Sequence, residues 1–173
     1  GIPNGNGMML LFNQKTGQPL AILCDHGILT DIRTAVAGQI CAKNFSNKIK
    51  RIGVIGTGTQ AKLQVEYLKN ITESRNVMIW GRDEKKMDQY KQHMEKIGFE
   101  VTFCKSPHEV ASECNLIITA TASKDYVLSN NDILEGTHIN AIGSDTPSKR
   151  ELGPGIIEKA DLVIADSIEQ CKY

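Results

Sequence analysis

The segment VIGTGTQA carries small residues at a spacing that suits a nucleotide-binding turn. Gly56, Gly58 and Ala61 form the G-x-G-x-x-[GA] pattern, directly after a strand-like apolar run and before a helical one. Glycines at 56 and 58 would permit a tight turn and a close approach of the backbone to a diphosphate, and alanine at 61 would permit close helix packing. The free N–H groups that open the helix would face the phosphates. The pattern predicts a dinucleotide site, with a ligand-free glycine turn as the alternative.

The residues about twenty positions further on bear on the type of dinucleotide, because NAD sites place an acid there to bind the ribose hydroxyls. The second predicted strand ends at Trp80, and Gly81 and Arg82 follow it. Arg82 could pair with a 2′-phosphate or stack on adenine. Alternatively, Arg82 is an exposed residue that opens the next helix, and Asp83 follows it directly. We therefore expect NAD(P) as cofactor, leaning to NADP(H).

Two charged residues have types and positions that suit catalysis. Asp145 follows the apolar run THINAIG, and in a closed, apolar site its carboxyl group would have a raised pKa, useful for acid–base chemistry. An Asx-turn before Pro147 is the alternative. Arg33 falls in the first turn of a predicted helix, where a guanidinium and the helix N-terminus together favour a carboxylate. A structural salt bridge from Arg33 to Asp31 is the alternative.

From Lys50 onward, strand-like and helical runs alternate, which is typical of a mainly parallel sheet covered by helices. Strands are predicted at 51–56, 76–81, 100–104, 115–121, 137–143 and 161–166, and helices at 59–71, 83–98 and 106–113. The fold class is therefore α/β, a Rossmann-like, doubly wound sheet. Thr121 ends one of these strands, at the carboxyl edge where such sheets bind ligands. Its alternative role is simply to end the strand.

The first part of the chain has a different pattern. The runs MMLLF and PLAILC predict a β-hairpin with its turn at 15–17, and a helix is predicted at 30–46 with Thr30 as its N-cap. We therefore predict two units, 1–46 and a dinucleotide-binding domain at 47–173. Because the chain begins without Met and stops soon after the last predicted strand, we expect it to be cut at both ends.

Composition argues against several classes of partner. Lys and Arg together number 20, as do Asp and Glu, and aromatic residues make up 5% of the chain. This balance favours neither nucleic acid nor a membrane surface as a partner, and no apolar run is long enough to span a bilayer. The five cysteines form no C-x-x-C pair, which favours reduced thiols in a cytoplasmic protein and predicts no metal site.

Several segments together resemble the ornithine cyclodeaminase/mu-crystallin family. They are TGQPLAIL, LTDIRTAVAG, VIGTGTQA, ITATASK and AIGSDTPSKREL, and they cover essentially the whole chain in order. The resemblance implies that Arg33 holds a substrate carboxylate beside the cofactor, and that Asp145, in a G-x-D-x-P-x-K motif, is the catalytic acid/base next to it. It also implies that further residues contact or flank the dinucleotide, namely Thr59, Gln60, Thr121, Ile142 and Lys149.

The resemblance further implies an enzyme similar to ornithine cyclodeaminase. Such an enzyme oxidises an L-diamino acid to an imine, closes a ring with loss of ammonia, and reduces the ring imine again. Ketimine or pyrroline-carboxylate reductase, alanine dehydrogenase, and a non-catalytic crystallin-like NAD(P)-binding protein are alternatives within the family. The resemblance also implies a homodimer, with residues 1–46 as the remnant of a substrate and dimerisation domain.

Overall fold

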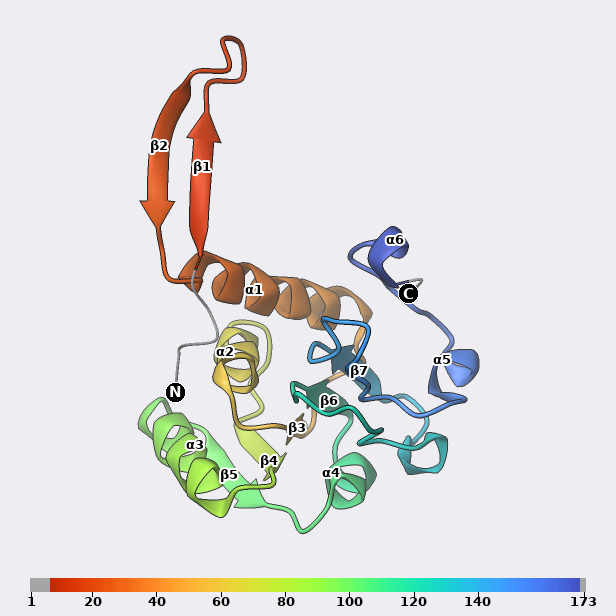
Figure 1. The fold of residues 1–173 in the computed structure, drawn as a ribbon. Helices are drawn as coiled ribbons and strands as arrows, with labels where there is room; N and C mark the ends of the chain where they lie inside the picture. Colours follow the sequence, from red (N-terminus) through yellow and green to blue (C-terminus); the bar gives the residue numbers. More distant parts are fainter. Residues whose placement is uncertain (1–6, 172–173) are drawn as a thin grey trace.

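The centre of the molecule is a parallel sheet flanked by helices (Figure 1). A computed structural model describes residues 7–171. Five parallel strands lie in the order β5 (Glu100–Phe103), β4 (Asn76–Trp80), β3 (Ile52–Ile55), β6 (Leu116–Thr119) and β7 (His138–Ala141). The order reverses between β3 and β6, which makes the carboxyl ends of these two strands the switch point of the sheet. The α/β, doubly wound prediction is confirmed.

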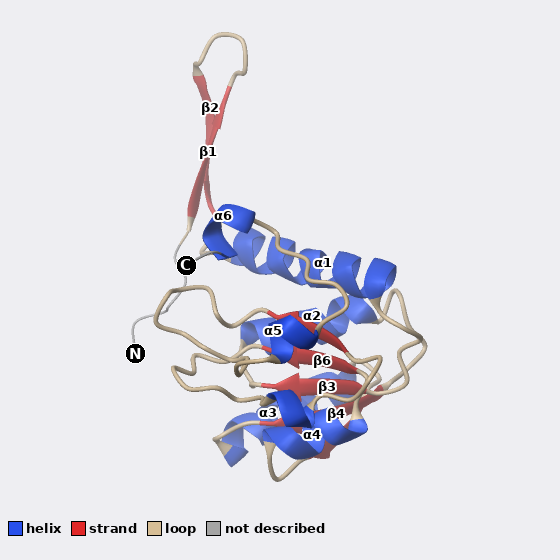
Figure 2. Ribbon diagram, turned by 90° about the vertical axis from the view of Figure 1, so that its right-hand side faces the viewer, coloured by secondary structure: helices blue, strands red, loops and turns tan. Residues whose placement is uncertain are grey.

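Helices cover both faces of the sheet (Figure 2). They are α1 (Ile28–Phe45), α2 (Thr59–Leu68), α3 (Glu84–Lys96), α4 (Pro107–Glu113), α5 (Ile156–Lys159) and α6 (Ile168–Cys171), with a 3-10 turn η1 (Asn130–Asp132). Side chains alternate along β3, so Ile52 and Val54 pack against α1, α2 and α3, while Ile55 packs with α4 and α5. The sheet is therefore buried on both sides, as its continuous apolar strands predict.

A two-stranded hairpin projects from this body beside the start of α1 (Figure 1). Strands β1 (Met8–Phe12) and β2 (Pro19–Cys24) are antiparallel, and the turn lies between them as predicted. Every residue of both strands is exposed, so the hairpin lies outside the core of the sheet. Helix α1 connects the two parts, because it packs on α2 and contacts β7.

Three local predictions are wrong. Residues 161–166, predicted as a strand, are irregular, and the apolar side chains at 162–164 are exposed. The predicted N-cap Thr30 lies inside α1, which begins two residues earlier with Gly27 at its N-cap, so Arg33 lies in the second turn of this helix and not, as predicted, in the first. The carboxylate of Asp25 accepts a hydrogen bond from the backbone N–H of Leu29 at 2.8 Å, and it thereby satisfies a free donor of the first turn.

Candidate functional site

The glycine loop turns sharply at Gly56, at the switch point of the sheet. Gly56 has φ of 121°, and its N–H donates to the carbonyl of Trp80 at 2.9 Å. A Cβ at this position would lie 2.3 Å from the carbonyl oxygen of Ala120. Both the backbone conformation and the close approach therefore require glycine, and the loop is held against the neighbouring ends of β4 and β6.

Gly58 differs from Gly56, because its backbone is extended and an added Cβ would meet no described atom within 4 Å. The space in front of the loop is open. Helix α2 begins at Thr59, so the N–H groups of Thr59, Gln60 and Ala61 have no partner within the helix. Ala61 is fully buried, as its position in the motif predicts. The loop fits a diphosphate bound by backbone amides at the positive end of the helix dipole.

The start of α1 is tied to the start of α2 through Gln60. The Nε2 of Gln60 donates to the Oδ1 of Asp31 at 3.0 Å and to its carbonyl oxygen at 3.1 Å. The alternative salt bridge between Arg33 and Asp31 does not form. Arg33 is exposed and makes no hydrogen bond or ion pair with any residue in 7–171. The side chain of Gln60 is thus occupied, and its backbone N–H is the group left for a phosphate.

The end of β4 carries no free carboxylate at the two positions that follow the strand. At Gly81, a Cβ would lie 2.7 Å from Cγ2 of Thr57, so a side chain there would collide with the glycine loop. Asp83 caps α3, its Oδ1 accepting from the N–H of Lys86 at 3.2 Å. Arg82 is exposed, and within the described part of the chain it has no polar partner. A guanidinium is therefore the free charged group next to the glycine loop at this strand end.

A buried carboxylate, which we did not predict from the sequence, forms hydrogen bonds with the ends of β6 and β7. Glu151 is 1% exposed, and its two oxygens accept hydrogen bonds from Thr119, Thr121 and Gly143. Both the N–H and the hydroxyl of Thr121, a predicted cofactor contact, are used in this way. The N–H of Ile142 donates to the carbonyl of Thr119 at 2.9 Å, which continues the pairing of β6 with β7 beyond the strands.

Asp145 lies two residues beyond Gly143, at the same carboxyl edge as the glycine loop. Its Oδ1 accepts from the Nζ of Lys149 at 2.5 Å, and its side chain is 65% exposed. The described residues thus do not provide the closed, apolar surroundings that we expected for this carboxyl group. They also show no hydrogen bond from the loop backbone to the carboxylate, so the Asx-turn alternative has no support there either.

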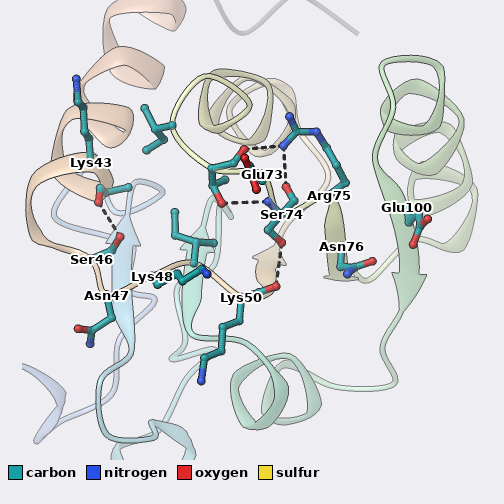
Figure 3. Close-up of a pocket in the computed structure, with 14 residues that line it drawn as sticks. Lys43, Ser46, Asn47, Lys48, Lys50, Glu73, Ser74, Arg75, Asn76 and Glu100 are labelled. Atoms are coloured by element: carbon teal, nitrogen blue, oxygen red, sulfur yellow. Dashed lines mark hydrogen bonds between the residues drawn. The ribbon is translucent and has the colours of Figure 1, made fainter.

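A cavity lies at the opposite edge of the sheet (Figure 3). Its volume is about 680 Å³, and it is lined by the end of α1, the segments that precede β3 and β4, and the first residues of β4 and β5. Arg75, the arginine in its wall, already donates to the carbonyls of Thr72 and Ser74. None of the predicted site residues lines this cavity. Within residues 7–171 there is no cluster of three His, Cys, Asp or Glu residues suited to a metal ion, and no helix with the length and apolarity needed to cross a bilayer.

Comparison with known proteins gives relatives that share this architecture. An archaeal alanine dehydrogenase dimer with bound NAD is 35% identical, with a TM-score of 0.90 over 100% of this chain and 53% of its own. The Δ1-pyrroline-2-carboxylate reductase of Thermococcus litoralis, solved with NADH and L-proline, is 29% identical, with a TM-score of 0.85 over 92% of this chain and 50% of its own. A lysine cyclodeaminase studied for recognition of L-lysine, L-ornithine and L-2,4-diaminobutyric acid is 28% identical, with a TM-score of 0.84 over 92% and 47%.

The chain spans about half the length of the curated relatives it matches, 53% for each of the first three. The family model covers the hairpin as well as the sheet, because the match runs over residues 1–173. The chain belongs to the ornithine cyclodeaminase/mu-crystallin family.

Proposed function

We propose that this chain is the dinucleotide-binding part of a nicotinamide-dependent enzyme that acts on a small amino acid. The observation that carries the proposal is the open row of amides at Gly58–Gln60, which shares one sheet edge with Asp145 and lies beside the start of α1. A bound nicotinamide would accept or donate a hydride. Relatives solved with NAD and with NADH support a cofactor of this class.

In this proposal, residues of the chain bind the dinucleotide and orient the substrate. The N–H groups of Thr59 and Gln60 bind the diphosphate, while Thr121 and Ile142 flank the dinucleotide at the ends of β6 and β7. Arg33, which has no polar partner among the described residues, would bind the substrate carboxylate in bidentate fashion. Holding the substrate in this way makes the reaction at Cα effectively intramolecular.

Asp145 would transfer protons to and from the substrate amine or a water molecule, and Lys149 would orient it through their salt bridge. The reaction we propose is that of an ornithine cyclodeaminase: an L-diamino acid is oxidised to an imine, the side-chain amine closes a ring, ammonia leaves, and the ring imine is reduced. The lysine cyclodeaminase relative supports this choice. A carboxylate near the amine suits the proton transfers that ring closure and ammonia release require.

Replacing Asp145 by Asn in the complete protein tests this role. We expect turnover to fall by about 100-fold or more, as for the loss of a general acid/base, while dinucleotide affinity stays unchanged. Asp88→Asn is the matched control, because Asp88 is exposed on α3, outside the loop that carries Asp145. Unchanged turnover in Asp145→Asn would remove this carboxylate from the mechanism.

A reductase or dehydrogenase is the second candidate function. Its support is the likeness to alanine dehydrogenase and to pyrroline-carboxylate reductase, both with higher TM-scores than the cyclodeaminase. Ammonia release without net change in NAD(P)H indicates cyclodeamination, whereas an equimolar change in NAD(P)H indicates a dehydrogenase or reductase. Dinucleotide binding without turnover of any of these substrates would indicate a crystallin-like binding protein.

We further propose NADP(H) as the preferred cofactor. At the end of β4, Asp83 is occupied in capping α3 and Gly81 has no room for a side chain, so Arg82 is the free charged group beside the loop. A guanidinium there would pair with a 2′-phosphate. Fluorescence titration with NADPH and NADH tests this: Arg82→Ala should weaken NADPH binding and leave NADH binding alone. Tighter binding of NADH by the unmodified protein would refute the preference.

We propose a homodimer for the complete protein. The support is the dimeric alanine dehydrogenase relative and the exposed apolar hairpin, whose side chains need cover. Sedimentation equilibrium of the complete protein tests it, and a monomer at micromolar concentration would contradict it.

A further inference from the structure

The buried carboxylate of Glu151 joins the ends of two strands. Its Oε2 accepts from the hydroxyl of Thr119 and from the N–H of Gly143, each at 2.8 Å. Its Oε1 accepts from the N–H of Thr121 at 2.7 Å and from the same residue's hydroxyl at 2.8 Å. Thr119 is the last residue of β6, Thr121 lies just beyond it, and Gly143 follows β7. One side chain thus fixes the relative position of both strand ends.

The same contact closes the loop that carries Asp145. Gly143 begins this loop and Glu151 ends it, so the bond from the Gly143 N–H to the Glu151 carboxylate joins the two ends. Residues outside the loop also fix its last residue, because the carbonyl of Glu151 accepts hydrogen bonds from the N–H groups of Val127 and Leu128. Between these fixed ends lies the salt bridge of Asp145 with Lys149. The geometry of the loop therefore depends on the carboxylate at its base.

Glu151 makes no salt bridge with any described residue, so the donors to its two oxygens are all neutral groups. A neutral amide cannot replace the carboxylate in this arrangement. Each oxygen accepts one main-chain N–H, from Thr121 or from Gly143, and a main-chain donor cannot turn around. Whichever way the amide of a glutamine at this position was placed, its NH₂ would face one of these N–H groups, and a hydrogen bond would be replaced by two opposed donors.

We propose that Glu151 is a positioning residue: it fixes the Asp145 loop and Thr121 relative to the glycine loop. This inference rests on the proposed function for its catalytic consequence. Glycine at 143 is part of the same device, because a Cβ there would lie 2.4 Å from Oε1 of Glu151 and 2.5 Å from the carbonyl oxygen of Thr121. The buried carboxylate and the glycine are therefore matched to each other.

The test compares Glu151→Gln with the unmodified complete protein. We expect a folded protein whose kcat falls by about 100-fold, as for a reacting group displaced by about 1 Å. The Kd for the dinucleotide should change by about 10-fold or less. We also expect faster amide hydrogen exchange at 143–150. Glu158→Gln is the control, because Glu158 is exposed on α5 and should change none of these quantities.

Gly143→Ala is the second variant. It keeps the carboxyl group of Glu151 but separates this group from the backbone N–H of residue 143. It therefore tests the proposal if Glu151→Gln fails to fold. A folded variant with unchanged kcat, or with unchanged exchange at 143–150, overturns the proposal. If kcat and dinucleotide affinity fall by equal factors, general loss of structure explains the result and the positioning role is refuted. If the unmodified protein turns over no amino acid, the proposed function fails, and the exchange at 143–150 alone decides whether Glu151 holds this loop.

Discussion

Gly56 and Gly58 belong to one motif, yet their substitution should have opposite consequences. At Gly56 an added Cβ would lie 2.3 Å from a backbone oxygen, and φ is 121°. At Gly58 the backbone is extended and the added Cβ would meet no described atom within 4 Å. We therefore predict that Gly56→Ala damages the fold, whereas Gly58→Ala leaves the fold intact and damages dinucleotide binding.

The expected losses in stability and in dinucleotide affinity follow from this geometry. Strain at a positive φ together with a backbone overlap should cost Gly56→Ala about 3 kcal/mol of unfolding free energy, or about 6–12 °C in Tm for a chain of this size. For Gly58→Ala, the weaker N-cap preference of alanine offsets its smaller unfolded-state entropy, so the net change should be within about 0.5 kcal/mol. A methyl group in the path of the diphosphate should remove at least one charge-assisted hydrogen bond, about 1.5–3 kcal/mol, and raise the Kd by about 10- to 150-fold.

Thermal unfolding followed by circular dichroism and fluorescence titration with NAD(P)H measure the two effects on the same samples of the complete protein. The predicted pattern is a large fall in Tm for Gly56→Ala alone and a large rise in Kd for a stable Gly58→Ala. Dinucleotide binding by Gly58→Ala as tight as that of the unmodified protein, or a loss of stability as large as that of Gly56→Ala, would refute this prediction.

Two further predictions concern stability away from the loop. A Cβ at Gly38 would lie 1.9 Å from Oε1 of the buried Gln64, so Gly38→Ala should lower the unfolding free energy by about 1–3 kcal/mol, and urea denaturation measures it. Burial acts to raise the pKa of the Asp132 carboxyl, but hydrogen bonds from Ser129 and His108 bring it below its ordinary value of 3.8. Asp132 therefore stabilises the fold fully above about pH 4 and loses this effect as the pH falls through its folded-state pKa. Asp132→Asn should lower Tm at pH 7, with the difference narrowing below pH 4, and a constant difference down to pH 2 would contradict this.

The main elements of the fold follow from local patterns. The buried runs around Ile52 and Ile117 are continuous and apolar because helices cover both sides of the sheet. Residues 161–166 have a similar apolar composition, but they form no strand, because no strand lies beside them among residues 7–171. A strand needs a hydrogen-bonding neighbour, and composition alone does not supply one.

Only part of the candidate site could be predicted from the sequence. The spacing of Gly56 and Gly58 identifies the turn, because the backbone at Gly56 requires glycine and Gly58 leaves the space in front of the loop open. Glu151 was missed because its burial depends on donors that arrive from β6 and β7, and nothing in KREL distinguishes it from a solvated glutamate. The pairing of Gln60 with Asp31 was missed for the same reason, since it joins two helices 29 positions apart in the sequence.

The most direct test of the account is a crystal structure of the complete protein with its dinucleotide bound. We predict diphosphate oxygens within hydrogen-bonding distance of the N–H groups of Thr59 and Gln60, and a nicotinamide ring directed toward Asp145. A diphosphate bound elsewhere, such as the cavity beside Arg75 at the opposite edge of the sheet, or a ring directed away from Asp145, would contradict the account.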